Sequence, residues 1–357
     1  MPIVTLLIAF FSLIALVVIH EFGHFVLAKK FGAKVDEFGI GYPPRIFGKK
    51  FGETIYSLNI LPFGAFVKIH GEEGGVEDYH SFSGKPMWQR ALIVVGGVAS
   101  FWIVAVVLLT LVAGFWGVPQ AVSDDENDRL INPMIQVTDV VENSPAGKAG
   151  FKIGDFLVDF DKISSLQEFV SSNKGQEITL NVKRGQTVFS TELMPRFFYP
   201  EDEGPIGLVL VRVAFKPYTW WEAPLQGLIG TYRLTVDIVS GWVLGLKNLF
   251  GLAELPEGVK LELVGPLGIF SMLSQYSQIG LNYFLYLIAL IAVALALANL
   301  LPIPALDGGK LMFLFLEWVR KKPLNEKLEQ KITAVFFVLL ILMMIFVTIK
   351  FDIPKVF

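Results

Sequence analysis

Cysteine is absent from this chain of 357 residues, and charged side chains make up only 18% of it. The missing thiols exclude disulfides, thiolate nucleophiles and metal sites with Cys ligands. The charged fraction is too low for a water-soluble enzyme, a disordered tail protein or a disulfide-rich secreted module. Histidine is also scarce, with four residues, so any metal must use these imidazoles and carboxylates. A net charge of -3 gives no reason to expect a nucleic acid as partner.

Long uncharged runs take the place of the missing charge. The mean hydropathy is +0.57, and four runs are long enough to cross about 30 Å of hydrocarbon as helices. They predict a polytopic α-helical membrane protein with transmembrane helices at about 3–28, 91–117, 281–301 and 332–349. No basic residue precedes the first run, which continues into His20 and Glu21. We therefore interpret it as a retained helix and not as a signal peptide.

Lysine and arginine gather near the helix ends in residues 29–90 and 310–331. Short basic loops stay on the cytoplasmic side, which places both termini and residues 120–278 outside. The predicted organisation has four parts. These are an N-terminal membrane core over 1–118 with the cytoplasmic loop 29–90, an extracytoplasmic domain over 119–215, an extracytoplasmic or interfacial amphipathic segment over 216–278, and a C-terminal membrane core over 279–357.

The loop 29–90 contains an unusually apolar stretch. Residues 54–69 read as two short strands around the turn Leu61-Pro62-Phe63-Gly64. We expect a β-hairpin there. It is either an ordinary hairpin or one that dips into the membrane, where protein or water must satisfy its backbone.

A soluble module is predicted over 119–215. A strand at 137–141 leads into Ser144-Pro145-Ala146, Ala149-Gly150-Phe151 and Gly154-Asp155, and a strand at 156–160, a helix at 165–172 and a strand at 177–184 follow. This pattern resembles the PDZ domains of bacterial proteases; the alternative is a generic small β module. The resemblance implies a small α+β domain that binds extended peptides at a sheet edge.

Residues 225–252 are apolar but carry Arg233, Asp237 and Lys247. With tryptophans nearby, this composition favours an amphipathic helix at the membrane interface over a fifth span. A fifth span would also put the basic loop 310–331 on the wrong side of the membrane.

The sharpest motif is His20-Glu21-Phe22-Gly23-His24 at the end of the first apolar run. On an α-helix, residues i and i+4 share one face, so both imidazoles can bind one zinc ion. The glutamate between them can then act as general base on a zinc-bound water. Polar side chains in a membrane helix are costly and usually face an interior site. The alternative is a polar helix end at the interface, because Lys29 and Lys30 follow closely.

A zinc site of this kind needs a third protein ligand and an open position. Asp307 is the strongest candidate, because it follows a long uncharged run and topology places it at the cytoplasmic end, as it does His20 and His24. His70 and His80 are alternatives, although their loop is charged and rich in glycine. A loop-capping role for Asp307 is the other possibility.

Taken together, the HEFGH motif, the PDZ-like insert and the stretch NLLPIPALDGG at 299–309 resemble the site-2 protease family. This is a family of intramembrane zinc metalloproteases, and the bacterial regulator-of-sigma-E type is the most similar. The resemblance covers nearly the whole chain. It includes residues 61–68, which are similar to the family's membrane-associated β-hairpin, and Gly265-Pro266-Leu267-Gly268 before the third helix.

The resemblance implies one Zn²⁺ bound by His20, His24 and Asp307, with Glu21 as general acid and base. It implies substrate contacts at Asn299, Gly64, Ala65, Phe66 and Ser100. The expected reaction is hydrolysis of peptide bonds within or near the transmembrane segments of single-pass membrane proteins, such as anti-sigma factors or signal-peptide remnants. The expected place is the bacterial inner membrane, with the active site toward the cytoplasm. A peptide or protein ligand of the PDZ-like domain is a further expected partner.

Some positions depart from the family pattern. Gly97 and Ser100 stand in the second helix where members often carry Pro and Asn, and Ser100 is shorter although it can still donate a hydrogen bond. Lys310 follows the Asp-Gly-Gly motif where related sequences often have His. Only one PDZ-like module fits between the second and third helices, so size filtering by tandem modules is not expected.

Two other classes of function compete with proteolysis. A membrane scaffold or assembly factor would recruit client proteins through the PDZ-like module, with zinc structural or absent. A transporter would carry polar groups across several helices, but the second and fourth helices have no charge.

Overall fold

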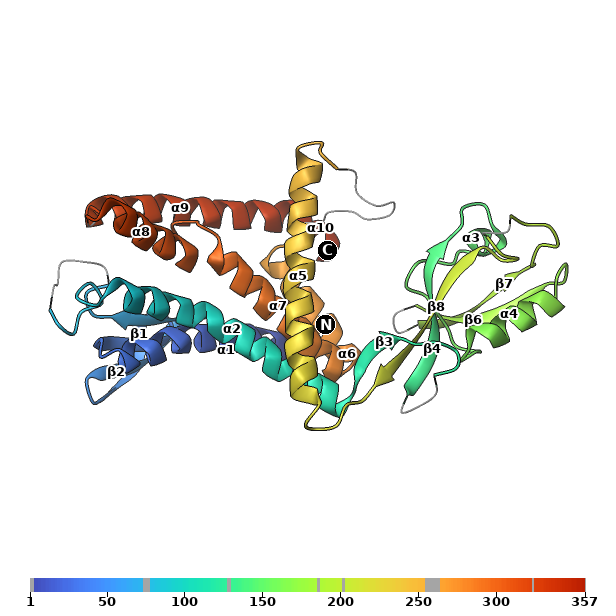
Figure 1. Cartoon of the computed structure of the whole chain (residues 1–357), viewed down its shortest axis with the longest axis horizontal. Coiled ribbons are helices and arrows are strands. Elements are labelled where there is room, and N and C mark those ends of the chain that lie inside the picture. Colours follow the sequence, from blue (N-terminus) through green and yellow to red (C-terminus); the bar gives the residue numbers. More distant parts are fainter. Residues whose placement is uncertain are drawn as a thin grey trace. The chain divides into compact units, whose positions relative to one another are not determined.

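The computed structural model describes residues 3–72, 78–126, 130–184, 187–200, 203–253, 264–322 and 324–356 (Figure 1). The chain forms two compact units. Residues Met1–Thr110 and Pro224–Phe357 make up the first, and Leu111–Ala223 make up the second. Part of the predicted interfacial segment, residues 254–263, lies outside the described residues.

Among the described residues, four helices of the first unit are long and apolar enough to cross a membrane, which confirms the four predicted spans. These helices are α1 (Ile3–Lys30), α2 (Met87–Phe115), α7 (Leu281–Leu300) and α9 (Glu326–Val347), the last continued by a π-helical turn, Thr348–Asp352, and by the short α10 (Ile353–Val356). Leu16 of α1, Val98 of α2 and Ala292 of α7 are fully buried or nearly so in a shared apolar core, to which α9 contributes no buried residue. The chain is therefore a multi-pass membrane protein.

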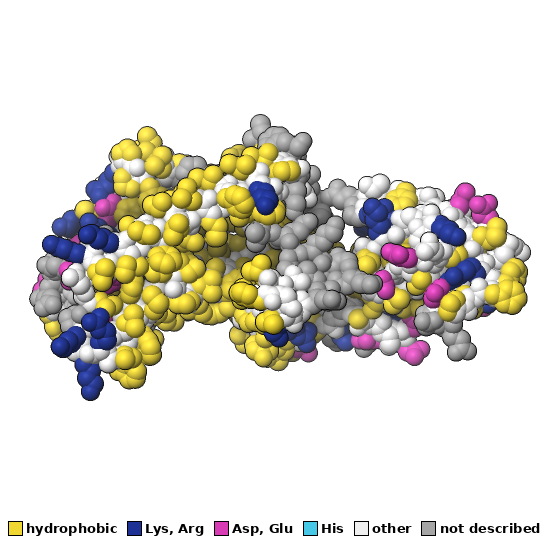
Figure 2. All heavy atoms as spheres, turned by 90° about the horizontal axis from the view of Figure 1, so that it is seen from above, with side chains coloured by type: hydrophobic (Ala, Val, Ile, Leu, Met, Phe, Trp, Pro, Cys, Tyr) yellow, Lys and Arg dark blue, Asp and Glu magenta, His cyan; other side chains and the backbone are white. Residues whose placement is uncertain are grey.

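The surface of the first unit agrees with this description. On the face seen in Figure 2, hydrophobic side chains dominate this unit, and Lys and Arg gather at the end where β1, β2 and α8 lie (Figures 1 and 2). Exposed apolar side chains on α9, such as Phe337 and Leu342, have no reason to face water and suit a lipid environment.

Helix α5 (Ala223–Leu249) crosses the spanning helices of the first unit at a steep angle (Figure 1). Gly227 lets it approach α2 closely, because a Cβ there would lie 2.2 Å from the hydroxyl oxygen of Thr110. Leu234 is buried in the core, and Thr235 accepts a hydrogen bond from the indole of Trp102. This helix is not among the four with spanning character. The following helix, α6 (Pro266–Ile279), packs against α1 and α7.

A separate sheet of the first unit is built from β1 (Val35–Phe51) and β2 (Thr54–Ile69). Residues 37–40 of β1 pair on one side with 65–68 of β2 and on the other with 55–58. The predicted hairpin within 54–69 is therefore wrong in its pairing. Both predicted runs are strands, but they flank β1 instead of forming a hairpin by themselves. The sequence did not predict a strand at residues 37–40, because they include Glu37 and Gly39, and acidic residues and glycine are poor strand formers.

A helix also occupies residues that were predicted to be a loop. α8 (Asp307–Arg320) begins directly after the turn that ends α7, and it buries Phe313 and Leu314. Its basic residues suggested a solvated loop, but the buried Phe313 and Leu314 give this segment the one apolar face of an amphipathic helix.

The second unit is a six-stranded antiparallel sheet with strand order β3-β8-β4-β5-β6-β7. The strands are β3 (Val118–Ala121), β4 (Ile131–Val140), β5 (Phe156–Leu157), β6 (Ile178–Arg184), β7 (Thr187–Leu193) and β8 (Leu208–Lys216). Helix α3 (Pro145–Lys148) is capped by Ser144, and α4 (Ile163–Ser172) buries Leu166 and Val170 against the sheet. The strands and the helix predicted between 137 and 184 are thus present.

Candidate metal centre

The candidate site contains two histidines that lie one helical turn apart. His20 and His24 lie on α1 and are both buried, with 8% and 7% of their surface exposed. Their Nε2 atoms are 3.3 Å apart. The ring of His20 stacks on Phe101 of α2, with 4.7 Å between ring centroids. Helical spacing therefore brings both imidazoles to one face of α1, as the sequence predicts.

The turn between α7 and α8 brings a carboxylate to the same place. Asp307 is the first residue of α8, and its Oδ2 lies 3.3 Å from the Nε2 atoms of both histidines. The turn is tight because two glycines follow. A Cβ on Gly308 would lie 2.2 Å from the carbonyl oxygen of Leu301, and one on Gly309 would lie 2.3 Å from that of Ile303.

The three ligand atoms fit one tetrahedrally bound zinc ion. Each is 3.3 Å from the other two, and ligands at 2.0–2.1 Å from a tetrahedral zinc are about 3.3 Å apart. Oδ2 of Asp307 is buried and has no hydrogen-bond partner among the described residues. A buried carboxylate oxygen facing two imidazole nitrogens is costly unless a cation lies between them. Among the described residues, no other such group of histidine and acidic side chains converges.

A backbone carbonyl sets the tautomer of His24. Nδ1 of His24 lies 2.9 Å from the carbonyl oxygen of Ile93. A carbonyl can only accept a hydrogen bond, so Nδ1 must carry the proton. This leaves the lone pair of Nε2 directed toward Asp307, where a metal would be bound.

Glu21 lies between the two histidines in sequence and is held by β2. The backbone N–H of Val67 donates a hydrogen bond of 3.0 Å to its Oε2. The side of β2 that faces away from β1 is therefore directed at the acidic residue next to the candidate ligands. Sequence reasoning missed this contact, because it depends on how the β1–β2 sheet packs on α1.

Close crossing of α1 and α2 also shapes the site. A Cβ on Gly97 would lie 2.1 Å from Nε2 of His24, and one on Gly23 would lie 2.2 Å from the carbonyl oxygen of Gly96. Only glycine leaves room for the imidazole and for the two backbones. The signal was present in the sequence, because small residues in apolar helices mark close helix contacts in membranes.

The other predicted substrate contacts have local partners or a defined local conformation in this structure. The hydroxyl of Ser100 donates to the carbonyl of Gly97 at 2.6 Å, and the amide of Asn299 donates to the carbonyl of Leu295 at 3.0 Å. On β2, Gly64 has a φ of 81°, Ala65 is buried, and the ring of Phe66 stacks on Tyr42.

The alternative third ligands are used elsewhere. His70 lies between two carboxylates, with Nδ1 3.1 Å from Asp36 and Nε2 3.4 Å from Asp78. Neither His70 nor His80 belongs to the converging group of His20, His24 and Asp307.

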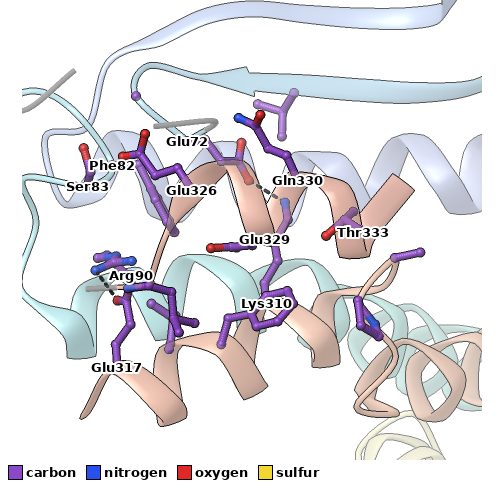
Figure 3. Close-up of a pocket in the computed structure, with 17 residues that line it drawn as sticks. Glu72, Phe82, Ser83, Arg90, Lys310, Glu317, Glu326, Glu329, Gln330 and Thr333 are labelled. Atoms are coloured by element: carbon purple, nitrogen blue, oxygen red, sulfur yellow. Dashed lines mark hydrogen bonds and ion pairs between the residues drawn. The ribbon is translucent and has the colours of Figure 1, made fainter. Parts of the chain in front are cut away.

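A cavity of about 460 Å³, lined by both charged and apolar side chains, lies beside the centre. It is bordered by Val67, which holds Glu21, and by Pro304 and Ala305, which precede Asp307. Two ion pairs line it (Figure 3): Lys310 with Glu72 at 2.5 Å, and Arg90 with Glu317 at 3.1 Å. The charge of Glu72 raises the pKa of Lys310 above its ordinary value.

Comparison with known proteins agrees with this geometry. Residues 8–343 match the model of peptidase family M50. The chain is 35% identical to a protein of Clostridium perfringens named as a zinc metalloprotease, over 97% of both chains. It is 28% identical to the regulator of sigma-W protease RasP of Bacillus subtilis, over 96% of both chains.

The family match covers most of the chain, and the converging imidazoles and carboxylate suit the metal that these relatives are named for. Zinc is thus the cofactor that the donor set and the relatives both indicate. The chain belongs to peptidase family M50, the site-2 proteases, and is a zinc metalloprotease.

Proposed function

We propose that this metalloprotease cleaves peptide bonds within or near the transmembrane segments of single-pass membrane proteins. The position of the candidate centre carries the proposal. His20, Glu21 and His24 lie within α1, one of the four helices that can span a membrane. A peptide bond that reaches them must come from a segment in the bilayer or at its edge.

The proposed ligands are His20, His24 and Asp307, and the proposed acid and base is Glu21. Zinc bound there would polarise the scissile carbonyl and lower the pKa of a water molecule. Glu21 takes a proton from the attacking water and returns it to the nitrogen of the leaving amine. The N–H of Val67 keeps the Glu21 carboxylate in place during both transfers.

Strand β2 is the proposed substrate platform. A helical substrate hides its carbonyls in hydrogen bonds and must unwind before it is cut. The extended segment Gly64, Ala65 and Phe66 leads directly to Val67, whose N–H faces Glu21. An unwound substrate can align along this strand by β-addition. Substrates with weak helix formers near the cut should therefore be cleaved faster. Asn299 is proposed as a further substrate contact, and Ser100 as a weak one, because its hydroxyl already donates to the carbonyl of Gly97.

The proposed orientation follows the distribution of charge. Lys and Arg gather at the end of the first unit that carries β1, β2 and α8 (Figure 2), and basic loops favour the cytoplasm. We therefore place the active site toward the cytoplasmic side of the bacterial plasma membrane and the second unit outside. α5 fits the interface, because Leu228 and Tyr232 on one side are exposed while Leu234 on the other is buried.

We also infer that the second unit is a PDZ-like domain with a peptide or protein ligand. The order of β4, α3, β5, α4 and β6 supports it, because it follows the pattern that the sequence resembles. The four-part organisation into 1–118, 119–215, 216–278 and 279–357 remains our proposal for the domain boundaries.

The decisive experiment uses the purified full chain with a model single-pass substrate, with and without chelator. We expect Glu21→Gln to keep its zinc and lose turnover by about 10²–10⁴-fold, the usual contribution of a general acid or base. Asp307→Ala should lose both zinc and turnover. Glu53→Gln is the matched control, because Glu53 pairs with Lys29 away from the centre. Wild-type turnover in Glu21→Gln would overturn the proposal.

A further inference from the structure

Lys310 is one of the residues that depart from the family pattern, and the structure shows what it contacts. It lies on the first turn of α8, three residues after Asp307. Its ammonium group reaches away from that helix to the carboxylate of Glu72 (Figure 3). The pair therefore starts from the same helical turn that carries the candidate ligand.

Glu72 is tied to the strand that holds the catalytic base. Its backbone N–H donates to the carbonyl of Ile69, the last residue of β2, at 3.2 Å. Val67, two residues before Ile69, donates to Glu21. One short segment of chain thus contacts Glu21 at one end and Lys310 at the other.

We propose that Lys310 is a positioning residue, which holds Asp307 and Glu21 in register by pairing with Glu72. The contacts form a closed ring through Glu21, Val67, Glu72, Lys310 and Asp307, and the imidazoles on α1 complete it. Without the pair, the first turn of α8 and the end of β2 lose a direct link. This inference rests on the proposed function for the roles of Glu21 and Asp307.

The size of the effect follows from the exposure of the pair. The Lys310 side chain is 45% exposed and that of Glu72 is 20% exposed, so solvent screens part of the attraction. A loss of roughly two- to fivefold in kcat is expected when the pair is broken, with little change in KM, because ion pairs this exposed are weak. A group that touched the reacting atoms would cost far more.

Two single variants and one double variant test the pair. Lys310→Met and Glu72→Gln should lower kcat to the same extent, and the double variant should be no worse than either. Lys310→Arg keeps the charge and should restore most of the activity. Additive losses in the double variant would overturn the proposal, because they mean that the two residues act separately.

Release of zinc to a chelator gives a second readout with a decisive sign. Removing a cation near a metal ion should, by charge alone, make the metal leave more slowly. A loosened Asp307 should make it leave faster. We expect roughly two- to fivefold faster release from both Lys310→Met and Glu72→Gln. Slower release from Lys310→Met would overturn the positioning role.

Arg90→Met is the matched control, because Arg90 forms an ion pair in the same cavity. Its partner Glu317 lies ten residues after Asp307 on α8. It should change neither zinc release nor kcat. If it matches Lys310→Met in both, the cavity responds to any lost ion pair and the proposal fails. If the wild-type chain shows no chelator-sensitive proteolysis, the proposed function fails, whereas equal zinc release from wild type and Lys310→Met rejects the positioning role independently.

Discussion

Each unit of the molecule buries an aspartate, and the two carboxylates have opposite surroundings. Asp155 of the second unit is fully buried, and both of its oxygens are paired. Arg184 donates to Oδ1 and Oδ2 at 2.7 and 2.8 Å, and the N–H of Lys152 donates to Oδ2 at 2.8 Å. Asp307 of the first unit is buried nearly as well, yet its Oδ2 has no hydrogen-bond partner among the described residues.

The difference separates a structural carboxylate from one that needs a ligand. The chain itself neutralises Asp155, whereas Oδ2 of Asp307 lies 3.3 Å from the Nε2 atoms of two imidazoles. An orphan oxygen is not sufficient evidence by itself. Asp352 also has one, although its other oxygen accepts a hydrogen bond from the N–H of Gly265 at the start of α6. The converging imidazoles distinguish Asp307 from Asp352.

The same substitution in both units should give the largest and most different effects. Asp307→Asn is expected to weaken zinc binding by more than about 100-fold, because even second-shell partners are worth 10–100-fold. It should leave the unfolding of the second unit unchanged. Asp155→Asn should keep zinc and activity and destabilise the second unit by about 2–3 kcal/mol, because a charged hydrogen-bonded pair is broken. Metal analysis and thermal unfolding measure the two effects. Loss of zinc in Asp155→Asn would break the comparison.

Gly97 is expected to give the next largest effect. Gly97→Ala would place a methyl group 2.1 Å from Nε2 of His24, so either the ring turns or α1 and α2 separate. We expect zinc content and turnover to fall by about tenfold or more, since overpacking costs about 1–3 kcal/mol. Gly114→Ala, in the same helix, is the control, because its Cβ would make only an ordinary contact of 3.4 Å. A fully active Gly97→Ala would show that the imidazole tolerates displacement.

The metal centre also shows which contacts can be predicted from the sequence. His20 and His24 are predicted correctly to share one face, because helical spacing alone decides it. Small residues indicate that α1 and α2 approach each other closely. The particular contacts of Gly97 with His24 and of Val67 with Glu21 depend on how α1, α2 and β2 cross, which no local pattern encodes.

The two fold errors have the same origin. The central strand segment 37–40 contains Glu37 and Gly39, so its local composition argues against a strand and only pairing on both sides makes it one. For α8, the basic residues predicted a solvated loop, although the same segment contains Phe313 and Leu314, which are buried. The composition of this segment indicated correctly that part of it faces solvent. The helical spacing of its apolar residues predicts the secondary structure better.

Acid should affect the second unit through Asp155. Burial raises the pKa of this carboxyl, but the hydrogen bonds from Arg184 and Lys152 lower it more, so it lies below the ordinary value. A lowered folded-state pKa stabilises the fold above the unfolded value of about 3.9 and loses that contribution as the pH falls below it. The protection of the β6 amides against hydrogen exchange in the full chain, corrected for the intrinsic exchange rate, should therefore fall below about pH 4. Asp155→Asn should remove this acid dependence. If the dependence persists in Asp155→Asn, other carboxylates cause it.

Ser100 should give the smallest effect, and it tests the rule behind the comparison inside the first unit. Ser100 is buried near the centre, but its hydroxyl already donates to the carbonyl of Gly97 at 2.6 Å. If hydrogen-bond satisfaction separates structural from functional groups, Ser100 belongs with Asp155 despite its location. Ser100→Ala should then change kcat by less than about threefold and stability by about 1 kcal/mol, the worth of one hydrogen bond. A loss of tenfold or more in kcat with unchanged stability would mean that the hydroxyl leaves Gly97 when substrate binds. Satisfaction in the free enzyme would then be no guide to function at this site.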